Sequence, residues 1–378
     1  MNAYIVDFAR SPFHFARKGQ LAGLRPDDLA AQVVRSLLAR QPFEPGLIED
    51  IILGCAYPEG AQGDNLARIV GFLAGLPSSV AGITMNRFCG SSMSAIHVAV
   101  GSIATGAGEA FLCVGVESMS MVPQGGLNSS PNPRLLADYP EAYTAMGMTA
   151  ENLANRYAIP RSEQELFATA SQQKAATAAR TGAFEREIVP VQLGDGTLID
   201  ADGCPRPTTS AEGLAQLKPA FLETGSVTAG TSSPLTDGAT AVLVASEDFV
   251  HAHGLKPLAQ IKAIAVAGCP PEIMGIGPVP ASRKALARAR LTMADIDLVE
   301  LNEAFASQAL ACLRDLEIDP RKLNLDGGAL ALGHPLGATG ARITGKAAGL
   351  LQRTGARYAL ATQCIGGGQG IATVLERV

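Results

Sequence analysis

Several features are missing from this sequence of 378 residues, and each absence narrows the range of functions. No run of five or more like charges occurs and the net charge is −5, which argues against a nucleic-acid surface. The seven cysteines form no C-x-x-C motif and no cluster. We therefore expect neither a disulfide framework nor a zinc site, and the cysteine pattern favours a reducing cytoplasm.

No stretch of the chain has the pattern of a membrane span. The most apolar segment, residues 95–116, contains four glycines together with His97 and Glu109, which divide it into a helix and a following strand. The N-terminus is typical of a first strand and not of a signal peptide. These patterns predict a soluble, cytoplasmic protein.

Motifs for nucleotide and metal binding are also missing. No G-x-G-x-x-G follows an expected strand. Residues 340–346 have the spacing of a phosphate-binding loop, but residue 347 is alanine and lacks the hydroxyl that binds magnesium. His251 and His253 have no partner ligands nearby. We expect neither a metal nor a nucleotide cofactor.

The chain does contain enough apolar sequence, 47% of its residues, to bury a large core of two or more lobes. Strands alternate with helices near both ends, which predicts an α/β protein with a mostly parallel sheet covered on both faces. The pattern of residues 50–114 recurs in residues 296–362, and a loop-rich passage separates the two. We expect an N-terminal α/β half (1–117), an inserted loop domain (118–236) and a C-terminal α/β half (237–378).

Residues 86–92 have the features of a nucleophile site. A short strand, expected to be buried, ends at residue 85, and a helix follows with Ser91 or Ser92 as its cap. At such a turn the sulfur of Cys89 would lie near free backbone N–H groups and the positive end of the helix dipole, and both favour the thiolate. An isolated cysteine is more often a small core residue, so this interpretation depends on the rest of the chain.

Three further stretches carry polar or reactive side chains. Each has a structural explanation when it is taken alone. Asn302 could cap a helix that begins at Glu303, whose carboxylate would favour the helix N-terminus. His334 lies in a fixed Gly-His-Pro turn, and Cys364 follows a strand and precedes a glycine run. The stretches are residues 302–306 (NEAFA), 327–337 (GGALALGHPLG) and 364–368 (CIGGG).

Taken together with residues 86–92, and in this order, these stretches closely resemble the thiolase family. The likeness runs nearly end to end and includes residues 226–230 and 274–282. It implies a thiolase-like fold, in which two similar mixed-sheet halves form alternating α/β layers with a loop domain inserted in the first. It also implies an acyltransferase that reversibly cleaves 3-ketoacyl-CoA with CoA, giving acyl-CoA and acetyl-CoA through an acyl-cysteine.

The resemblance assigns a role to each residue at its matching position. Cys89 is similar to the nucleophile that attacks the 3-keto carbon, and Cys364 to the acid and base that protonates or deprotonates acetyl-CoA. His334, and a water held by Asn302, resemble the donors to the enolate oxygen, and His334 also resembles a group that activates the thiols. Backbone N–H groups of Cys89 and Gly366 would meet the tetrahedral oxyanion.

The resemblance also bears on substrates and partners. Ser233 is similar to a serine on the pantetheine arm of CoA, and Lys218 to a cation near CoA, although an ordinary surface lysine is an equal alternative. Ala145 stands where acetoacetyl-specific relatives have histidine, which favours the degradative branch. Residues 124–139 are hard to align, so a homodimer and a homotetramer both stay open, as does association with a β-oxidation hydratase–dehydrogenase subunit.

Three other functions stay open at this point. The first is acetyl-CoA acetyltransferase, which forms acetoacetyl-CoA. A decarboxylating ketoacyl synthase shares the broad fold, but the second cysteine, Cys364, argues against it. A non-catalytic acyl-CoA-binding relative would be expected to have lost Cys89, His334 or Cys364, and all three are present.

Overall fold

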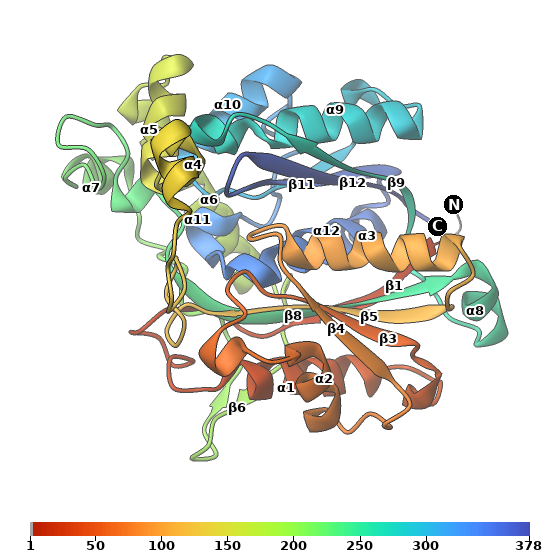
Figure 1. Cartoon of the computed structure of the whole chain (residues 1–378). Coiled ribbons are helices and arrows are strands. Elements are labelled where there is room, and N and C mark those ends of the chain that lie inside the picture. Colours follow the sequence, from red (N-terminus) through yellow and green to blue (C-terminus); the bar gives the residue numbers. More distant parts are fainter. Residues whose placement is uncertain (1–2) are drawn as a thin grey trace.

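The computed structural model describes residues 3–378, so the first two residues of the expected N-terminal half lie outside the described chain. Two half-sheets alternate with layers of helices (Figure 1). The N-terminal half-sheet has the order β4 (Ala81–Met85), β3 (Asp50–Gly54), β5 (Ala110–Ser118), β8 (Thr236–Ser246) and β1 (Ala3–Arg10). The C-terminal half-sheet has the order β9 (Ala259–Gly268), β12 (Gln369–Glu376), β11 (Tyr358–Ile365) and β10 (Leu298–Leu301).

Within residues 3–378, the two half-sheets are joined only where β1 meets β9, through the pairs Tyr4–Gln260 and Ile5–Ala259. Within each half, a parallel pair is followed by an antiparallel one. In the N-terminal half, β3 and β5 are parallel and β5 and β8 are antiparallel. In the C-terminal half, β10 and β11 are parallel and β11 and β12 are antiparallel. This repetition confirms the fold of two similar mixed-sheet halves. The expectation of a mostly parallel sheet is wrong, because the strands that join and flank the parallel pairs run antiparallel to their neighbours.

Helices cover both faces of each half-sheet. The central layer holds α3 (Ser91–Ala104) and α12 (Leu336–Thr354), which pack against each other and against both half-sheets. Every residue of β5 and β8 is buried because α1 packs on one face and the central helices on the other. The outer helices are α1 (Pro26–Leu38) and α2 (Leu66–Leu73) on the N-terminal side, and α9 (Pro278–Ala289) and α10 (Ala306–Leu316) on the C-terminal side (Figure 1).

The central helices approach each other closely at Gly340. A Cβ at that position would lie 2.4 Å from the backbone nitrogen of Met93 on α3. Glycine therefore allows the two helices to cross with their N-terminal ends near one another. Residues 340–346, which have the spacing of a phosphate-binding loop, lie inside α12 and form no loop.

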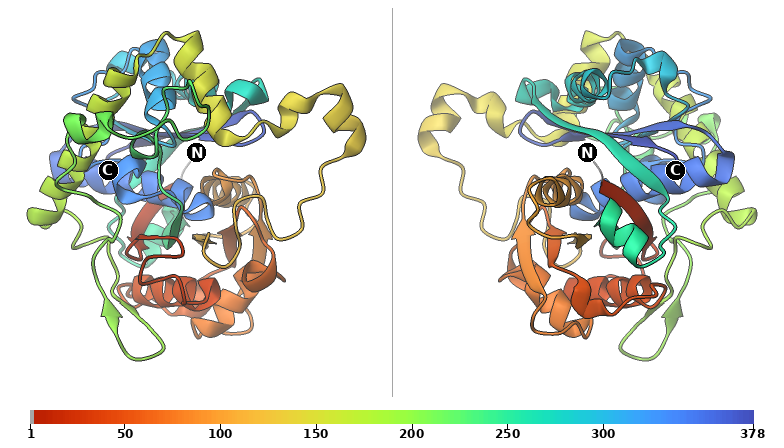
Figure 2. Two further views of the ribbon diagram at one scale, coloured as in Figure 1. Left: turned by 90° about the vertical axis from the view of Figure 1, so that its left-hand side faces the viewer. Right: turned by 90° about the vertical axis from the view of Figure 1, so that its right-hand side faces the viewer.

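The passage between β5 and β8 supplies the remaining large elements. Helices α5 and α6 pack beside α10, and residues around α4 extend away from the body as an arm (Figure 2). Strand β8 pairs with β1 and β5, so it belongs to the N-terminal half-sheet. The division of the chain at residue 237 stays a prediction, and this pairing favours a later boundary. The elements are α4 (Pro133–Asp138), α5 (Met146–Arg156), α6 (Arg161–Arg180), β6 (Val191–Gln192), β7 (Leu198–Ile199) and α7 (Ala211–Ala215).

Besides the short 3-10 helices, three short elements remain in the part of the chain that the structure describes. Strand β2 (His14–Phe15) pairs with β8, α8 (Glu247–Ala252) follows β8, and α11 (Ala329–Leu332) precedes α12. Among residues 3–378, no helix combines the length and apolar character needed to cross a bilayer.

Two local expectations are wrong. Strand β4 is not buried, because it forms the edge of its half-sheet and leaves Ile83 49% exposed. Helix α3 is not capped by a serine: its N-cap is Gly90, the hydroxyl of Ser91 donates to the Phe88 carbonyl, and that of Ser92 accepts from Ala341 of α12. The serines therefore fix the cysteine turn and the contact between the central helices.

Candidate active site

The four motif stretches meet where the central helices begin. Cys89 precedes α3 by two residues, and His334 precedes α12 by two. Asn302 follows β10 and Cys364 lies near the end of β11, and these strands are parallel, so their carboxyl ends lie at the same edge. Ligands of α/β proteins bind at this kind of edge. Two of the motifs come from strand ends and two from helix starts.

Cys89 lies in a strained turn. The preceding residue, Phe88, has a φ of 44°, which is rare for a residue with a bulky side chain. The Cys89 side chain is half-buried, and its sulfur faces the backbone N–H groups of Gly366 and of Cys89 itself. Burial nevertheless raises the pKa of the thiol to about 11, and the Glu117 carboxylate adds to the rise, while the two N–H groups lower it. The N–H groups favour the thiolate, as expected, but desolvation outweighs them.

The cysteine turn is joined to the hairpin between β11 and β12. The side-chain amide of Gln363 donates a hydrogen bond to the Cys89 carbonyl. Gly90 packs against Ile365, since a Cβ at residue 90 would lie 2.5 Å from the Ile365 Cδ1 atom. The backbone of residue 366 is thus held next to the sulfur of Cys89.

Cys364 lies on the same hairpin and is buried. It packs in an apolar cluster with Phe305, Met274 and Val227. Burial raises its pKa well above the usual value, and the neighbouring Cys89 contributes to that shift. The structure therefore brings the two cysteines together and keeps both in the thiol form at neutral pH.

His334 is buried and hydrogen-bonded on three sides. Its backbone N–H donates to the Thr236 hydroxyl over 3.0 Å. Its Nδ1 lies 2.6 Å from the hydroxyl oxygen of Thr339, and its Nε2 lies 3.4 Å from the side-chain nitrogen of Asn302. Burial, followed by the positive charge of Arg342, lowers the pKa of the imidazole to about 3. The ring is neutral at physiological pH.

Asn302 is fixed by the neighbouring strand and faces His334. Its backbone N–H donates to the Thr362 carbonyl of β11 over 3.0 Å. Its side-chain oxygen is buried and has no donor among residues 3–378, so a water is needed to satisfy it. Helix α10 begins at Ala306 and not at Glu303, with Phe305 as its N-cap. Asn302 is therefore no helix cap, and its side chain is free for the site.

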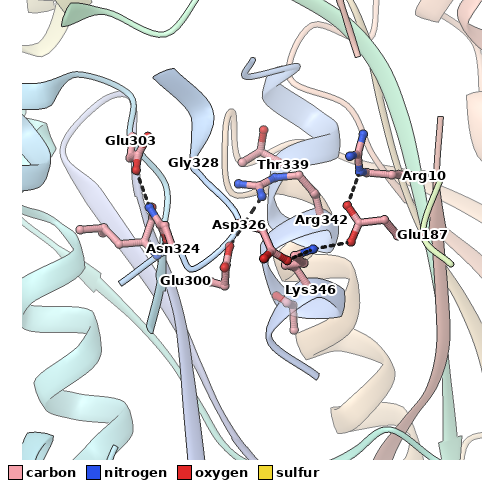
Figure 3. A network of polar contacts seen from close by, with 12 residues as sticks. Arg10, Glu187, Glu300, Glu303, Asn324, Asp326, Gly328, Thr339, Arg342 and Lys346 are labelled. Carbon is pink, nitrogen blue, oxygen red and sulfur yellow. Dashed lines mark hydrogen bonds and ion pairs between the residues drawn. The ribbon is translucent and has the colours of Figure 1, made fainter. Parts of the chain in front are cut away.

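Glu303 has the structural role that we expected, but at another helix. Its carboxylate accepts hydrogen bonds from the Ser171 hydroxyl, the Asn324 side chain and the backbone N–H of Leu330. Leu330 lies in the first turn of α11. Figure 3 shows Glu303 turned toward Asn324 and beside Gly328. The carboxylate thus ties the Asn302 loop to the segment that leads into His334.

The two candidate CoA contacts differ in their surroundings. Ser233 is half-buried, and its backbone N–H donates to the Ala304 carbonyl over 2.9 Å, which places it beside the Asn302 loop. Lys218 is exposed and follows α7. Nothing in the structure brings it to the cysteines, and its role stays a prediction.

Sequence reasoning missed Glu117, a buried carboxylate behind the nucleophile. It accepts hydrogen bonds from the backbone of Ala56 and Tyr57, from Gln62, and from Gly337 at the start of α12. Burial raises its pKa. A single glutamate in the otherwise apolar run of β5 is the signal that could have revealed it.

A second missed feature is a buried network of charges behind α12 (Figure 3). Lys346 contacts Glu187 over 2.8 Å and Asp326 over 2.5 Å. Arg342 faces Glu300 of β10, and their closest atoms are 3.6 Å apart. Among residues 3–378, no three His, Cys, Asp or Glu side chains gather in a way that could hold a metal ion.

Comparisons with known proteins agree with this geometry. The family model "Thiolase, N-terminal domain" matches residues 3–248, and "Thiolase, C-terminal domain" matches residues 255–377. A 3-ketoacyl-CoA thiolase of Pseudoalteromonas translucida is 48% identical over 386 residues, covering 100% of this chain and 99% of the relative. One of Bacillus subtilis is 46% identical over 387 residues, covering 99% of each.

Solved structures give the same result. The crystal structure of human mitochondrial 3-ketoacyl-CoA thiolase matches with a TM-score of 0.92 and 39% identity, covering 100% of this chain and 99% of the other. The structure of that protein in complex with CoA also has a TM-score of 0.92, at 39% identity, and covers 100% of this chain and 98% of the other. From the four motifs, their convergence at one site and these matches, the chain belongs to the thiolase family.

Proposed function

We propose that this protein is a 3-ketoacyl-CoA thiolase, an acyltransferase that cleaves 3-ketoacyl-CoA with CoA and forms acyl-CoA and acetyl-CoA. The observation that carries the proposal is the placement of the Cys89 sulfur against the Gly366 N–H, with the Cys364 thiol beside it. A nucleophile, backbone donors and a second proton-transfer group thus share one site. The full-length relatives named 3-ketoacyl-CoA thiolase support the same reaction.

The first half-reaction transfers the acyl group to Cys89. The Cys89 proton passes to Nε2 of His334 as the sulfur attacks the 3-keto carbon, and a C–S bond forms. The N–H groups of Cys89 and Gly366 stabilise the resulting oxyanion. Its collapse breaks the bond between C2 and C3, and the Cys364 thiol gives its proton to C2 of the leaving acetyl-CoA enolate. The protonated Nε2 and a water on Asn302 donate to the enolate oxygen.

The second half-reaction returns the enzyme to its starting state. The Cys364 thiolate takes the proton of an incoming CoA thiol, and the CoA sulfur attacks the thioester on Cys89. Acyl-CoA forms, the C–S bond to Cys89 breaks, and the departing Cys89 sulfur recovers its proton from His334. The balance is one 3-ketoacyl-CoA and one CoA consumed for one acyl-CoA and one acetyl-CoA produced.

Other functions fit the site less well. A decarboxylating synthase needs no second thiol for proton transfer. The Cys364 thiol would then have no role in the reaction, yet it lies beside the nucleophile. The degradative direction with longer acyl chains is favoured by Ala145, which precedes α5 and has a small side chain. Acetyl-CoA acetyltransferase is the second candidate. CoA and acyl-CoA are proposed as substrates, contacted by Ser233, and the site needs no further cofactor.

We also propose that the protein acts as a homodimer in the cytoplasm. The unpaired edge of β4 supports this, because exposed edge strands pair readily with a second chain. A homotetramer and association with a hydratase–dehydrogenase subunit stay predictions. The arm around α4, with exposed Leu135 and Leu136, is the segment on which we expect such contacts.

The test is CoA-dependent cleavage of 3-ketoacyl-CoA substrates from four to twelve carbons, with Cys89→Ala as the comparison. Cleavage that increases with chain length and is lost in the variant is expected. Activity restricted to the four-carbon substrate would favour acetyl-CoA acetyltransferase. No cleavage at any length would overturn the proposal.

A further inference from the structure

Thr339 is the closest polar partner of the His334 ring. It lies in the first turn of α12, is fully buried, and places its hydroxyl oxygen 2.6 Å from Nδ1 of His334. The same hydroxyl lies 3.0 Å from the Pro335 carbonyl oxygen. One hydroxyl therefore joins the imidazole to the start of the helix.

The geometry of these contacts assigns the proton on the ring. A hydroxyl has one proton, and the Pro335 carbonyl can only accept, so Thr339 can make both hydrogen bonds only by donating to that carbonyl and accepting from Nδ1. The bond between Thr339 and His334 then requires a proton on Nδ1. On the opposite side, the Asn302 side-chain nitrogen donates toward Nε2 over 3.4 Å, which agrees with a lone pair on Nε2.

The helix that carries Thr339 is held in place from behind. Arg342 lies one turn beyond Thr339 and faces Glu300 of β10, and Lys346 is paired with Glu187 and Asp326 (Figure 3). Glu300 precedes Asn302 by two residues on the same stretch of chain. The charge network thus fixes Thr339 and Asn302 on opposite sides of the imidazole.

We propose that Thr339 is a positioning residue that holds the proton of His334 on Nδ1, so that Nε2 keeps the lone pair that faces Asn302 and, in the proposed reaction, receives the Cys89 proton. The inference deepens the proposed thiolase reaction and rests on it for the identity of the thiol. Without the hydroxyl, the ring can rotate or move its proton to Nε2, and it then loses the lone pair needed to accept the proton.

The chain offers a matched control for this idea. Thr344 lies on the same helix, is fully buried, and donates to the Gly340 carbonyl over 2.7 Å, as Thr339 does to Pro335. The structure gives the Thr344 hydroxyl no contact with His334. Thr339→Val and Thr344→Val therefore remove the same kind of helix contact, but only the first removes the partner of the ring.

The experiment compares thiolysis by wild type, Thr339→Val, Thr339→Ser and Thr344→Val at matched folded fractions. We expect Thr339→Val to lower kcat about 10- to 100-fold, the range found when the partner that orients a metal-bound histidine is lost, with KM within about twofold. The serine variant should recover most of the activity, and Thr344→Val should remain near wild type. Equal activity of the two valine variants would overturn the proposal.

A second measurement does not depend on activity. The ring nitrogens of ¹⁵N-labelled histidine report the tautomer, and the His334 signals are assigned by their loss in His334→Gln. The proposal requires a protonated Nδ1 in wild type, and a protonated Nε2 would overturn it even if Thr339→Val does not fold. Wild type that shows the expected tautomer but no thiolysis would instead contradict the proposed function.

Discussion

The Glu303 carboxylate fills the space that a side chain at residue 328 would need. A Cβ on Gly328 would lie 2.1 Å from the Glu303 carboxyl carbon (Figure 3). The φ of Gly328 is −120°, which other residues adopt freely, so the contact and not the backbone requires glycine. The Asn302 loop and the His334 segment are in contact at this point.

Gly328→Ala should therefore push the two segments apart. We expect a loss of about 1–3 kcal/mol in the free energy of unfolding, the usual range for an overpacked site, and a lower kcat because Asn302 and His334 lose their spacing. Denaturant unfolding and thiolysis measure the two effects. The control is Gly23→Ala, since a Cβ at residue 23 meets nothing within 4 Å. Equal stability of both variants would contradict the role of the contact.

The hydrogen bond from Gln363 to the Cys89 carbonyl should affect activity more than stability. Gln363→Met removes this bond and also a buried side-chain oxygen that has no donor among residues 3–378. Loss of the hydrogen bond destabilises the fold, whereas loss of the unpaired buried oxygen stabilises it, so we expect little change in Tm. We expect kcat to fall by up to about tenfold, which corresponds to the free energy of one hydrogen bond. Gln352→Met, at an exposed amide, is the control. Unchanged kcat in Gln363→Met would show that the bond does not position Cys89.

Alkylation of Cys89 should depend on pH because burial raises its pKa to about 11. Below that pH the thiolate fraction rises about tenfold for each pH unit. The rate of iodoacetamide labelling, followed by peptide mapping, should therefore increase steadily between pH 7 and pH 9. Cys89→Ser corrects for the other cysteines. A labelling rate that does not change over this range would mean that the thiolate is already formed at pH 7.

Glu300 should make the protein less stable as the pH rises. Burial raises its pKa from 4.5 to about 7, while Arg342 and Lys346 lower it. Between these two values the folded protein holds a proton that the unfolded chain has released, so stability is lost as pH increases, by at most about 1.4 kcal/mol per pH unit. Glu300→Gln should flatten this dependence in urea unfolding at pH 5, 6, 7 and 8. The exposed Glu141→Gln should keep the slope of wild type, and an equal slope in Glu300→Gln would contradict the assignment.

The edge of β4 should mediate dimer formation. Ile83→Lys places a charge on this edge, where a second chain would bury it. We expect sedimentation to give a dimer for wild type and a monomer for the variant. Leu47→Lys is the control, because Leu47 is similarly exposed, at 47%, but lies outside the half-sheet. A dimer that survives Ile83→Lys would place the interface elsewhere.

Much of the fold could be predicted because the pattern that forms it is local. The apolar run of β5 and the spacing of the motifs follow from positions close together in the chain. The candidate site residues could be named because each stands in a short stretch of unusual composition, and the order of these stretches resembles one family. Their roles stay predictions. The repeat of strands and helices along the sequence also predicted two similar halves without any knowledge of the strand pairing.

What could not be predicted depends on contacts between distant residues. The exposure of β4 follows from its place at the sheet edge, which strand order alone decides. The raised pKa of Cys89 reflects burial by neighbouring loops, which opposes the local effect of the helix start. Glu303 resembles a cap for the next helix, but its carboxylate turns toward a segment 27 residues away. Glu117 and the Thr339–His334 contact depend on how the central helices pack.

The division of the site between the two halves has a consequence for refolding. Cys89 precedes the central helix of one half, whereas His334 and Cys364 come from the other. Either half could regain its strands and helices, and give a native circular dichroism signal, while the reaction remains absent. The rate at which thiolysis recovers after dilution from denaturant would therefore report the rate at which the two halves dock. The delay between recovery of the circular dichroism signal and recovery of thiolysis would give the lifetime of the folded but undocked halves.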